Sequence, residues 1–587
     1  MTPELRDGMR IAWDVPITMD DGLELRCDVF LPAADGRYPV LLSYGPYAKG
    51  LEFKRGYPSA WEAMIEQHPD VSAGSSNLYQ SWEVADPEKW VPHGYAMVRV
   101  DSRGAGSSPG VIDPFSARES RDLYACIEWA GVQEWSNGKV GLAGISYYAM
   151  NQWQVAAMQP PHLAAICPWE GAADWYRDAT HHGGILSTFW ANWYDVQVKS
   201  VQHGLGERGP RSPATGRPAC GEETLEEAEL EKRRVDFGAQ IHGHPLTDAY
   251  HADRTPDFSR IAVPLLSCGN WGGQGLHLRG NVEGYLQAGS RQKWLELHGI
   301  EHWTHFYTDY GRELQLRFFD FFLRGEDTGW SAQPPVLLNV RHADGSFTAR
   351  AEQEWPLART RWTALHLDAA GTQLGAAAGG SAQVSFDASG DGVTFLADPF
   401  TEETEITGPS SLKLFAASST DDADLFVILR LFDPAGDEVT FQGAIDPHAP
   451  LGQGWLRLSH RSLDQERSLP YRPYHPHRDL SEVRPGQVCE ADVEILPTCI
   501  VAPPGYRLGV TVQGHDYEHT GAGARLGHFR NELRGCGPFL HDDPDDRPPG
   551  RFAGTTTLHT GGEHASTLLI PVVPPATPAT ETAGAAS

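Results

Sequence analysis

The sequence lacks the patterns that mark several large classes of protein. Its eight cysteines are widely scattered and form no C-x-x-C pair, which argues against zinc or redox motifs and favours buried, free thiols. Lysine and arginine number 47 against 77 aspartate and glutamate residues, a formal net charge of −30. Because no basic stripe offsets this charge, we expect no nucleic-acid partner.

Long apolar runs are also missing. No stretch approaches the length of a membrane span, and Met1 to Asp21 lacks the basic and apolar regions of a signal peptide. We therefore expect no membrane partner and a cytoplasmic location. The chain does contain 40% hydrophobic residues, which is typical of folded proteins, and its 587 residues exceed what one hydrophobic core usually supports. Two or three folding units are expected.

The first third of the chain alternates predicted strands and helices, the pattern of an α/β fold with a mostly parallel sheet. The strand candidates are six short apolar runs: 39–44, 95–100, 139–143, 163–168, 263–268 and 293–298. A helix is predicted between the second and third, because the apolar residues there follow helical spacing: Leu123, Cys126, Ile127 and Ala130.

Two segments, 50–92 and 171–260, are too long to be simple connections between these elements. Insertions of this length usually build lids or caps. The second contains Trp190, Trp193 and a charged run over 222–234 that predicts a solvent-facing helix. We expect this segment to cover a pocket.

The pattern changes after a predicted helix at 312–324. Many short β-rich runs follow, separated by Gly, Asp and Pro turns, for example 410–416, 425–432 and 507–513. The predicted organisation is an α/β domain over 1–330, with a cap inserted at 171–260, then an all-β sandwich or jelly roll over 331–573. The tail over 574–587, rich in Ala, Thr and Pro, is expected to be disordered.

The strongest chemical signal is a turn centred on Ser146, where a predicted strand runs into a helix in the sequence Val140-Gly-Leu-Ala-Gly-Ile-Ser-Tyr-Tyr148. A nucleophile on such a turn needs small neighbours, and Gly144 supplies one, although Tyr148 departs from the G-x-S-x-G pattern. The strand before it and the helix after it favour Ser146 as a nucleophile. A serine nucleophile needs a histidine base and an orienting acid, which in this type of fold follow in the order serine, acid, histidine.

Three histidines cluster after the last predicted strand: His298, His302 and His305. One of them is expected to be the base. Neither a helix nor a suitably spaced carboxylate supports a metal here, so no metal site is predicted. In the β-rich half, His475 and His477 are interpreted as surface or hydrogen-bonded residues, and the acidic run 541–546 as a solvated turn.

Several motifs carry a resemblance to a known family: Asp101-Ser-Arg103-Gly104 with Gly106 and Ser107, Glu128-Trp129, Trp135 to Lys139, Gly144-Ile-Ser146-Tyr147, and Gln152-Trp153. With these motifs the chain resembles the cocaine esterase-like (CocE/NonD) hydrolases, relatives of the X-prolyl dipeptidyl peptidases and α-amino acid ester hydrolases, over most of its length. The resemblance implies an α/β-hydrolase fold with a helical cap and a C-terminal jelly roll. It also implies His302 as the base and an oxyanion role for Tyr47, paired with the backbone N–H of Tyr147.

The acid is where this sequence departs from the family. The family places an aspartate after the strand that corresponds to 263–268, and Gly272 stands at that position here. Three explanations of the missing aspartate are open: the acid comes from another position, the site works without an acid, or the protein is not catalytic. We favour the first and select Glu170, which follows the preceding strand on the same rim of the sheet as the nucleophile. The alternatives are Asp174, Glu301, Asp309 and no acid.

The sequence thus predicts a serine hydrolase that cleaves a small-molecule ester, or an amide, through an acyl-enzyme and without a cofactor. Esters are favoured over peptides because no carboxylate set for a free α-amine is evident. Four tryptophans predict an aromatic acyl pocket: Trp169, Trp190, Trp193 and Trp271. Acyl transfer, peptidase or amino-ester hydrolase activity, and a non-catalytic binding role are the alternatives. Substrate and homo-oligomerisation are left open.

Overall fold

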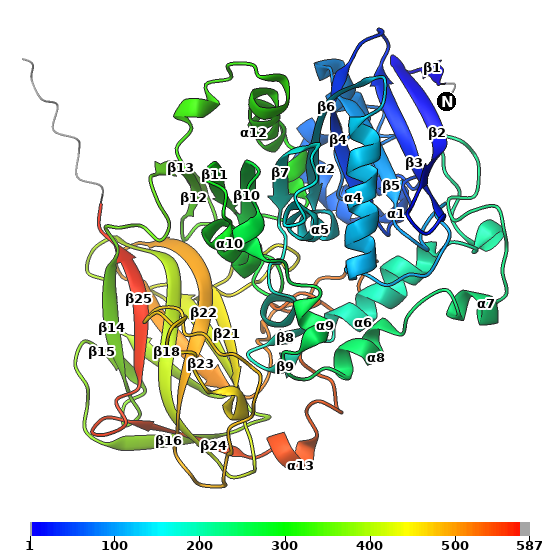
Figure 1. Cartoon of the computed structure of the whole chain (residues 1–587). Coiled ribbons are helices and arrows are strands. Elements are labelled where there is room, and N and C mark those ends of the chain that lie inside the picture. The colour runs from blue at the N-terminus through cyan, green and yellow to red at the C-terminus, as the bar shows by residue number, and fades with distance from the viewer. Residues whose placement is uncertain (1–2, 576–587) are drawn as a thin grey trace, which may run out of the picture.

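A mixed sheet of 11 strands forms the first half of the computed structural model, which describes residues 3–575 (Figure 1). Its strand order is β1-β2-β3-β5-β4-β6-β7-β10-β11-β12-β13. The strands are β1 (Glu4–Arg6), β2 (Met9–Thr18), β3 (Glu24–Pro32), β4 (Tyr38–Gly45), β5 (Ala96–Asp101), β6 (Ser136–Ile145), β7 (Leu163–Trp169), β10 (Leu265–Asn270), β11 (Lys293–His298), β12 (Val336–Arg341) and β13 (Phe347–Glu352).

The central strands, from β5 to β12, run parallel to one another. All six strands predicted in this region are present, and most of their residues are buried because helices cover both faces of the sheet. β5, for example, is buried along its whole length. The sheet continues past residue 330, where the predicted domain boundary lies, because β12 pairs with β11 and β13 with β12.

Helices follow most of the parallel strands. They are α1 (Phe53–Gly56), α2 (Pro58–Gln67), α3 (Pro87–Trp90), α4 (Ala117–Gly131), α5 (Tyr147–Ala156), α10 (Leu278–Gln287), α11 (Thr304–Tyr307) and α12 (Asp309–Phe319), with short turns η1 (Pro69–Val71), η2 (Val91–His93), η8 (Asp320–Arg324) and η9 (Trp330–Ala332). The predicted amphipathic helix is α4, which begins after Ser116, whose side chain accepts from the Glu119 amide. Its buried face contains Leu123, Cys126 and Ile127.

The insertion between β7 and β10 is built of short elements: η3 (Trp175–Thr180), β8 (His181–His182), β9 (Ile185–Leu186), α6 (Phe189–Trp193), η4 (Tyr194–Val198), η5 (Lys199–Val201), η6 (Gly206–Arg208), α7 (Glu227–Glu231), α8 (Phe237–His242), α9 (Ala249–Ala252) and η7 (Phe258–Arg260). The charged helix predicted over 222–234 is reduced to α7. Its first part stays extended because the Leu225 amide donates to the carbonyl of Gly204.

A second, mostly antiparallel sheet of 12 strands follows. Its elements are β14 (Arg361–Asp368), β15 (Gln373–Gly375), β16 (Ala382–Asp387), β17 (Val393–Ala397), β18 (Thr404–Ser418), β19 (Asp424–Phe432), β20 (Glu438–Val439), β21 (Gly452–Arg457), η10 (Leu458–His460), β22 (Cys489–Ala502), β23 (Arg507–Gln513), α13 (Pro549–Phe552), β24 (Thr555–Thr560) and β25 (Thr567–Val573). The predicted tail, 574–587, lies outside the described residues from position 576 onward.

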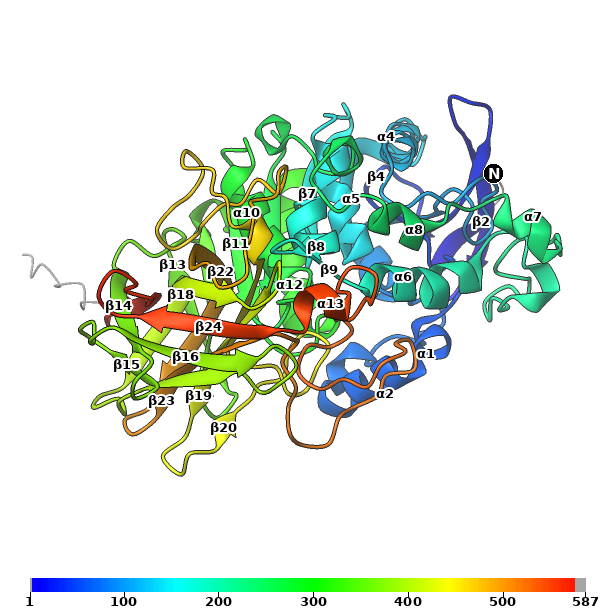
Figure 2. The same ribbon diagram turned by 90° about the horizontal axis from the view of Figure 1, so that it is seen from below.

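The long connection from β23 to α13 leaves the second sheet and crosses to the first half of the chain, where it lies beside α1 and α2 (Figure 2). The amide of Gly527 in this connection donates to the Ser59 hydroxyl over 3.0 Å. All eight cysteines are buried and free. Across residues 3–575, no helix combines the length and apolarity that crossing a membrane requires.

Candidate active site

Ser146 occupies the tight turn between β6 and α5. Its backbone has φ 56° and ψ −111°, a conformation that costs free energy for any residue except glycine. Gly144 allows the turn to close, since a Cβ atom there would lie 2.4 Å from the Cβ of Tyr148. The turn is held by the Ser146 amide, which donates to the carbonyl of Trp169 over 3.1 Å. This is the strained backbone that presents a nucleophile at the end of a buried strand.

A small, partly open cavity lies at Ser146, and His302 lines it as well. Its other polar lining residues are Tyr47, Glu83, Gln197 and His277. The remaining walls are apolar or aromatic: Trp82, Phe115, Tyr147, Phe189, Trp190, Trp193, Leu276, Ile445, Phe529 and Phe539. The last two lie in the connection from β23 to α13, so both halves of the chain shape the cavity.

Glu83 is the carboxylate beside His302, and sequence reasoning did not identify it. One of its carboxylate oxygens, Oε1, lies 3.0 Å from Nε2 of His302. Burial and neighbouring His277 hold the pKa of His302 well below its ordinary value, which keeps the ring neutral and able to accept a proton. The only sequence signal for Glu83 was its position in the long 50–92 insertion.

Glu170 lies elsewhere in the site. Its Oε1 is 3.0 Å from Nε2 of His298 and accepts from Asn270 Nδ2 over 3.2 Å. Among the described residues, Glu170 forms no ion pair with His302, so the predicted pairing differs from the observed one. Asn270 also donates to the carbonyl of Ile300 over 2.7 Å, two residues before His302. Asn270 therefore links Glu170 to the loop that carries His302.

The other acids considered are engaged with different partners. Asp174 pairs with Arg177 over 2.7 Å, and Asp309 pairs with Arg312 over 2.9 Å. Glu301 accepts from the Thr304 hydroxyl over 3.1 Å. None of the three lines the cavity at Ser146 within the described part of the chain.

Tyr47 lines the cavity, and its hydroxyl is bonded to one neighbour. Its hydroxyl oxygen accepts from Trp193 Nε1 over 3.0 Å, which leaves the phenolic proton free to be donated elsewhere. Burial raises the pKa of Tyr47 well above its ordinary value, so this proton is retained. The amide of Tyr147, the first residue of α5, has no acceptor within its own helix. Both residues predicted to hold the oxyanion, Tyr47 and Tyr147, thus line the same cavity as Ser146.

Trp169 and Trp271 do not line the cavity. Both are completely buried in the core, Trp169 against Phe306 and Trp271 near Trp355. Each lies at the end of a buried parallel strand, from which its side chain packs among neighbouring elements instead of reaching the pocket. Trp190 and Trp193, which were also predicted to form the acyl pocket, do line it.

His298 forms a buried ionic chain beneath the site. It lies between Glu170 and Glu296, with its Nδ1 2.7 Å from Glu296 Oε2. The two carboxylates outweigh burial and raise the pKa of His298 to about 10. The positive charge of His298 is therefore expected to stabilise the fold at neutral pH.

The pH dependence of stability should report this charge. A raised folded-state pKa contributes stability that is complete below about pH 6.5, the unfolded value, and is lost as pH rises toward 10. We expect His298→Gln to lower the melting temperature most at pH 6 or below, and the gap to the wild type to close toward pH 10. A gap that stays constant between these limits would contradict the charged form of His298.

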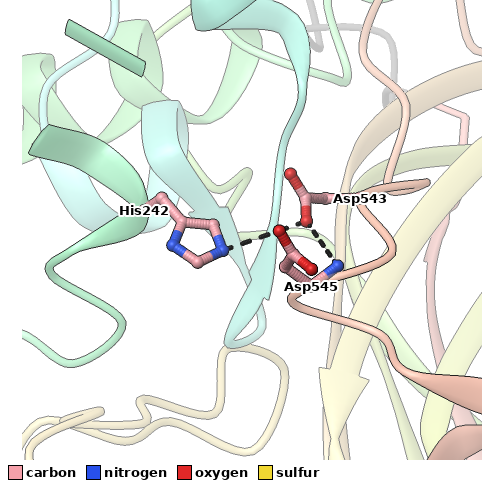
Figure 3. Close-up of side chains that lie close together, drawn as sticks. All are labelled: His242, Asp543 and Asp545. Carbon is pink, nitrogen blue, oxygen red and sulfur yellow. Dashed lines mark hydrogen bonds and ion pairs between the residues drawn. The ribbon is translucent and has the colours of Figure 1, made fainter. Parts of the chain in front are cut away.

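One cluster outside the cavity resembles a metal site in composition: His242, Asp543 and Asp545 (Figure 3). Asp543, which is half-buried, and the exposed Asp545 belong to an acidic turn, in which Asp543 Oδ1 accepts from the amides of Asp545 and Asp546 over 2.8 and 3.0 Å. These bonds account for the shape of the turn without an ion.

In the β-rich half, His475 bonds to the carbonyls of Ser462 and Asp492, in agreement with a hydrogen-bonding role.

A serine on a strained strand–helix turn, with a histidine in the same cavity at the edge of a mostly parallel sheet, defines an α/β-hydrolase of the serine hydrolase class. Residues 21–307 match the X-Pro dipeptidyl-peptidase (S15 family) model, and residues 328–569 match the X-Pro dipeptidyl-peptidase C-terminal non-catalytic domain.

Similarity to solved structures and characterised relatives identifies the family. A CocE/NonD family hydrolase from Staphylococcus aureus is 32% identical, with a TM-score of 0.82 over 96% of this chain and 94% of that chain. The cocaine esterase of Rhodococcus sp. is 25% identical over 96% of this chain and 98% of its own length. An α-amino acid ester hydrolase, 17% identical with a TM-score of 0.65, covers 97% of this chain and 98% of its own and shares the fold. The chain belongs to the CocE/NonD family of hydrolases, which confirms the predicted resemblance.

Proposed function

We propose that the protein hydrolyses an uncharged ester of a small apolar or aromatic acid through an acyl-enzyme on Ser146. The observation that carries this proposal is the shared cavity of Ser146 and His302, whose other walls are largely aromatic. An apolar acyl group would be buried against these walls, while the polar lining residues lie near the reacting atoms.

The proposed chemistry proceeds in two halves. Ser146 Oγ attacks the ester carbonyl and its proton passes to His302, while the Tyr47 hydroxyl and the Tyr147 amide donate to the resulting oxyanion. Collapse breaks the bond to the leaving alcohol, which takes the proton from His302. Water then attacks the acyl-enzyme in the same way, releasing the acid and restoring Ser146.

Esters fit the cavity better than substrates with a free amine. Glu83 is the single carboxylate among the described residues that line it, and its Oε1 already lies against His302. A free ammonium group would find no second carboxylate there, so its desolvation would not be compensated. The name of the Rhodococcus relative, cocaine esterase, also favours an ester substrate.

We propose that Glu170 positions the His302 loop through Asn270.

Labelling with a fluorophosphonate probe tests this function. The wild type is expected to form an adduct that maps to Ser146, Ser146→Ala to form none, and His302→Ala to react far more slowly, because the probe requires an activated serine. The wild type should also hydrolyse p-nitrophenyl acetate and benzoate in preference to alanine p-nitroanilide. An unlabelled wild type, or an adduct on another residue, would refute the proposal.

A further inference from the structure

We infer that Glu83 is the acid partner of His302 and supplies the carboxylate that this chain lacks after β10. The inference rests on the proposed function, since it assigns a role within the same site. It differs from the arrangement predicted from the sequence, in which Glu170 orients the base. The first support is direct contact: Glu83 Oε1 lies 3.0 Å from His302 Nε2, and both residues are buried.

The backbone fixes Glu83 against the nucleophile turn. Its carbonyl accepts from the amide of Ile145, the residue before Ser146, over 3.0 Å. A Cβ atom on Gly144 would lie 3.2 Å from the same carbonyl. Glu83 also has φ 61°, a left-handed conformation that costs a non-glycine residue roughly 1 kcal/mol or more. Strain of this kind persists where the surroundings hold a residue in place, and here it accompanies the strained backbone of Ser146.

The position of the family aspartate is closed to any side chain. A Cβ atom on Gly272 would lie 2.3 Å from the Cα of Gly443 and 2.7 Å from the amide nitrogen of Ala444. This segment of the second half also supports His302 directly, because the His302 amide donates to the Ala444 carbonyl over 2.8 Å. The backbone that holds His302 thus occupies the space of the usual acid, which has to come from another element.

The two nitrogens of His302 then have separate tasks. Nε2–H donates to the Glu83 carboxylate, which fixes the tautomer and stabilises the imidazolium that forms during the reaction. Nδ1 carries the lone pair that accepts the Ser146 proton. Within the described chain Nδ1 is buried and has no hydrogen-bond partner, so it is free for this transfer. In the familiar serine triad, Nε2 faces the serine and Nδ1 faces the acid. In this site the two ring nitrogens exchange these roles.

The pair should also impose a pH dependence on activity. Burial and the charge of Glu170 raise the pKa of Glu83 well above its ordinary value, so the carboxylate that accepts from His302 forms only at higher pH than a normal glutamate. The titratable groups around the pair are Glu170, His277, His298, His528, Tyr47, Tyr57, Tyr148 and Tyr307. Activity should therefore rise with pH through the titration of Glu83.

Glu83→Gln and Glu170→Gln form a matched pair of tests, because both replace a buried carboxylate at a left-handed backbone position and only Glu83 contacts His302. We expect Glu83→Gln to lower kcat on a p-nitrophenyl ester by about 10³- to 10⁴-fold, with little change in KM, and to abolish the acid limb of the pH profile. Glu170→Gln should lower kcat by no more than about tenfold, as expected for loss of a hydrogen bond or two.

Chemical rescue separates a catalytic carboxylate from a structural one. Formate should restore part of the activity of Glu83→Ala and none of that lost in Glu170→Ala. The inference is overturned if Glu83→Gln keeps kcat within about tenfold of the wild type, if Glu170→Gln loses more than Glu83→Gln, or if formate has no effect. Labelling of wild-type Ser146 by the fluorophosphonate is a separate measurement. It supports the proposed function even if the variants contradict the assignment of Glu83.

Discussion

His302→Ala is expected to lower kcat for ester hydrolysis by about 10⁶-fold, because the nucleophile and its base act as a unit and loss of either removes nearly the whole advantage of the site. His302 lines the cavity together with Ser146, and the low pKa of His302 keeps it neutral and ready to accept a proton. KM should change much less, since the aromatic walls that bind the acyl group are retained.

His305→Ala is the matched control. His305 belongs to the same histidine cluster, three residues further along, but it is not among the residues that line the cavity. Its replacement is expected to leave kcat within about tenfold of the wild type, with stopped assays on a p-nitrophenyl ester as the measurement. Equal losses in the two variants would mean that His302 acts through the structure of the loop and not as the base.

The fold was predictable because its signals are local. Most residues of the parallel strands are buried, so these strands appear in the sequence as short, mainly apolar runs, as β7 and β10 illustrate. The turn at Ser146 is local too, since a strand, Gly144 and a helix follow one another directly. The addition of β12 and β13 to the first sheet was not predictable in this way, because their pairing with β11 is a long-range contact and their composition resembles that of the second sheet.

The partners within the site were less predictable, because they come from distant segments. Glu83 meets His302 across 219 positions of the chain, and nothing in the residues around Glu83 indicates this contact. Glu170 was placed on the correct rim of the sheet, since both Glu170 and Ser146 follow neighbouring parallel strands. The histidine that contacts Glu170 is His298, the last residue of β11, and not His302 in the loop that follows this strand. Trp169 and Trp271 show the same limit, because a position at the end of a strand does not indicate whether the side chain packs in the core or lines the pocket.

Tyr47→Phe is expected to lower kcat by about 10²- to 10³-fold, the loss typical for removal of one oxyanion donor. The ring, which packs against Tyr147 and Trp193 at centroid distances of 6.1 and 6.3 Å, is retained in this variant, so the cavity should keep its shape. The Tyr147 amide is still present and accounts for the residual activity. Binding of a neutral substrate analogue should be nearly unchanged.

A double-mutant cycle with Trp193 decides whether the Tyr47 proton is the active group. Trp193→Phe removes the N–H that donates to the Tyr47 oxygen and should lower kcat by about 3- to 10-fold in the wild type, the value of one hydrogen bond. In Tyr47→Phe the same change should have no further effect, because there is no hydroxyl left to orient. Trp190→Phe is the control, since Trp190 Nε1 donates to the Ala179 carbonyl instead. Additive losses from Tyr47 and Trp193 would indicate two independent packing effects, and the oxyanion would then have to be held by the Tyr147 amide with another donor.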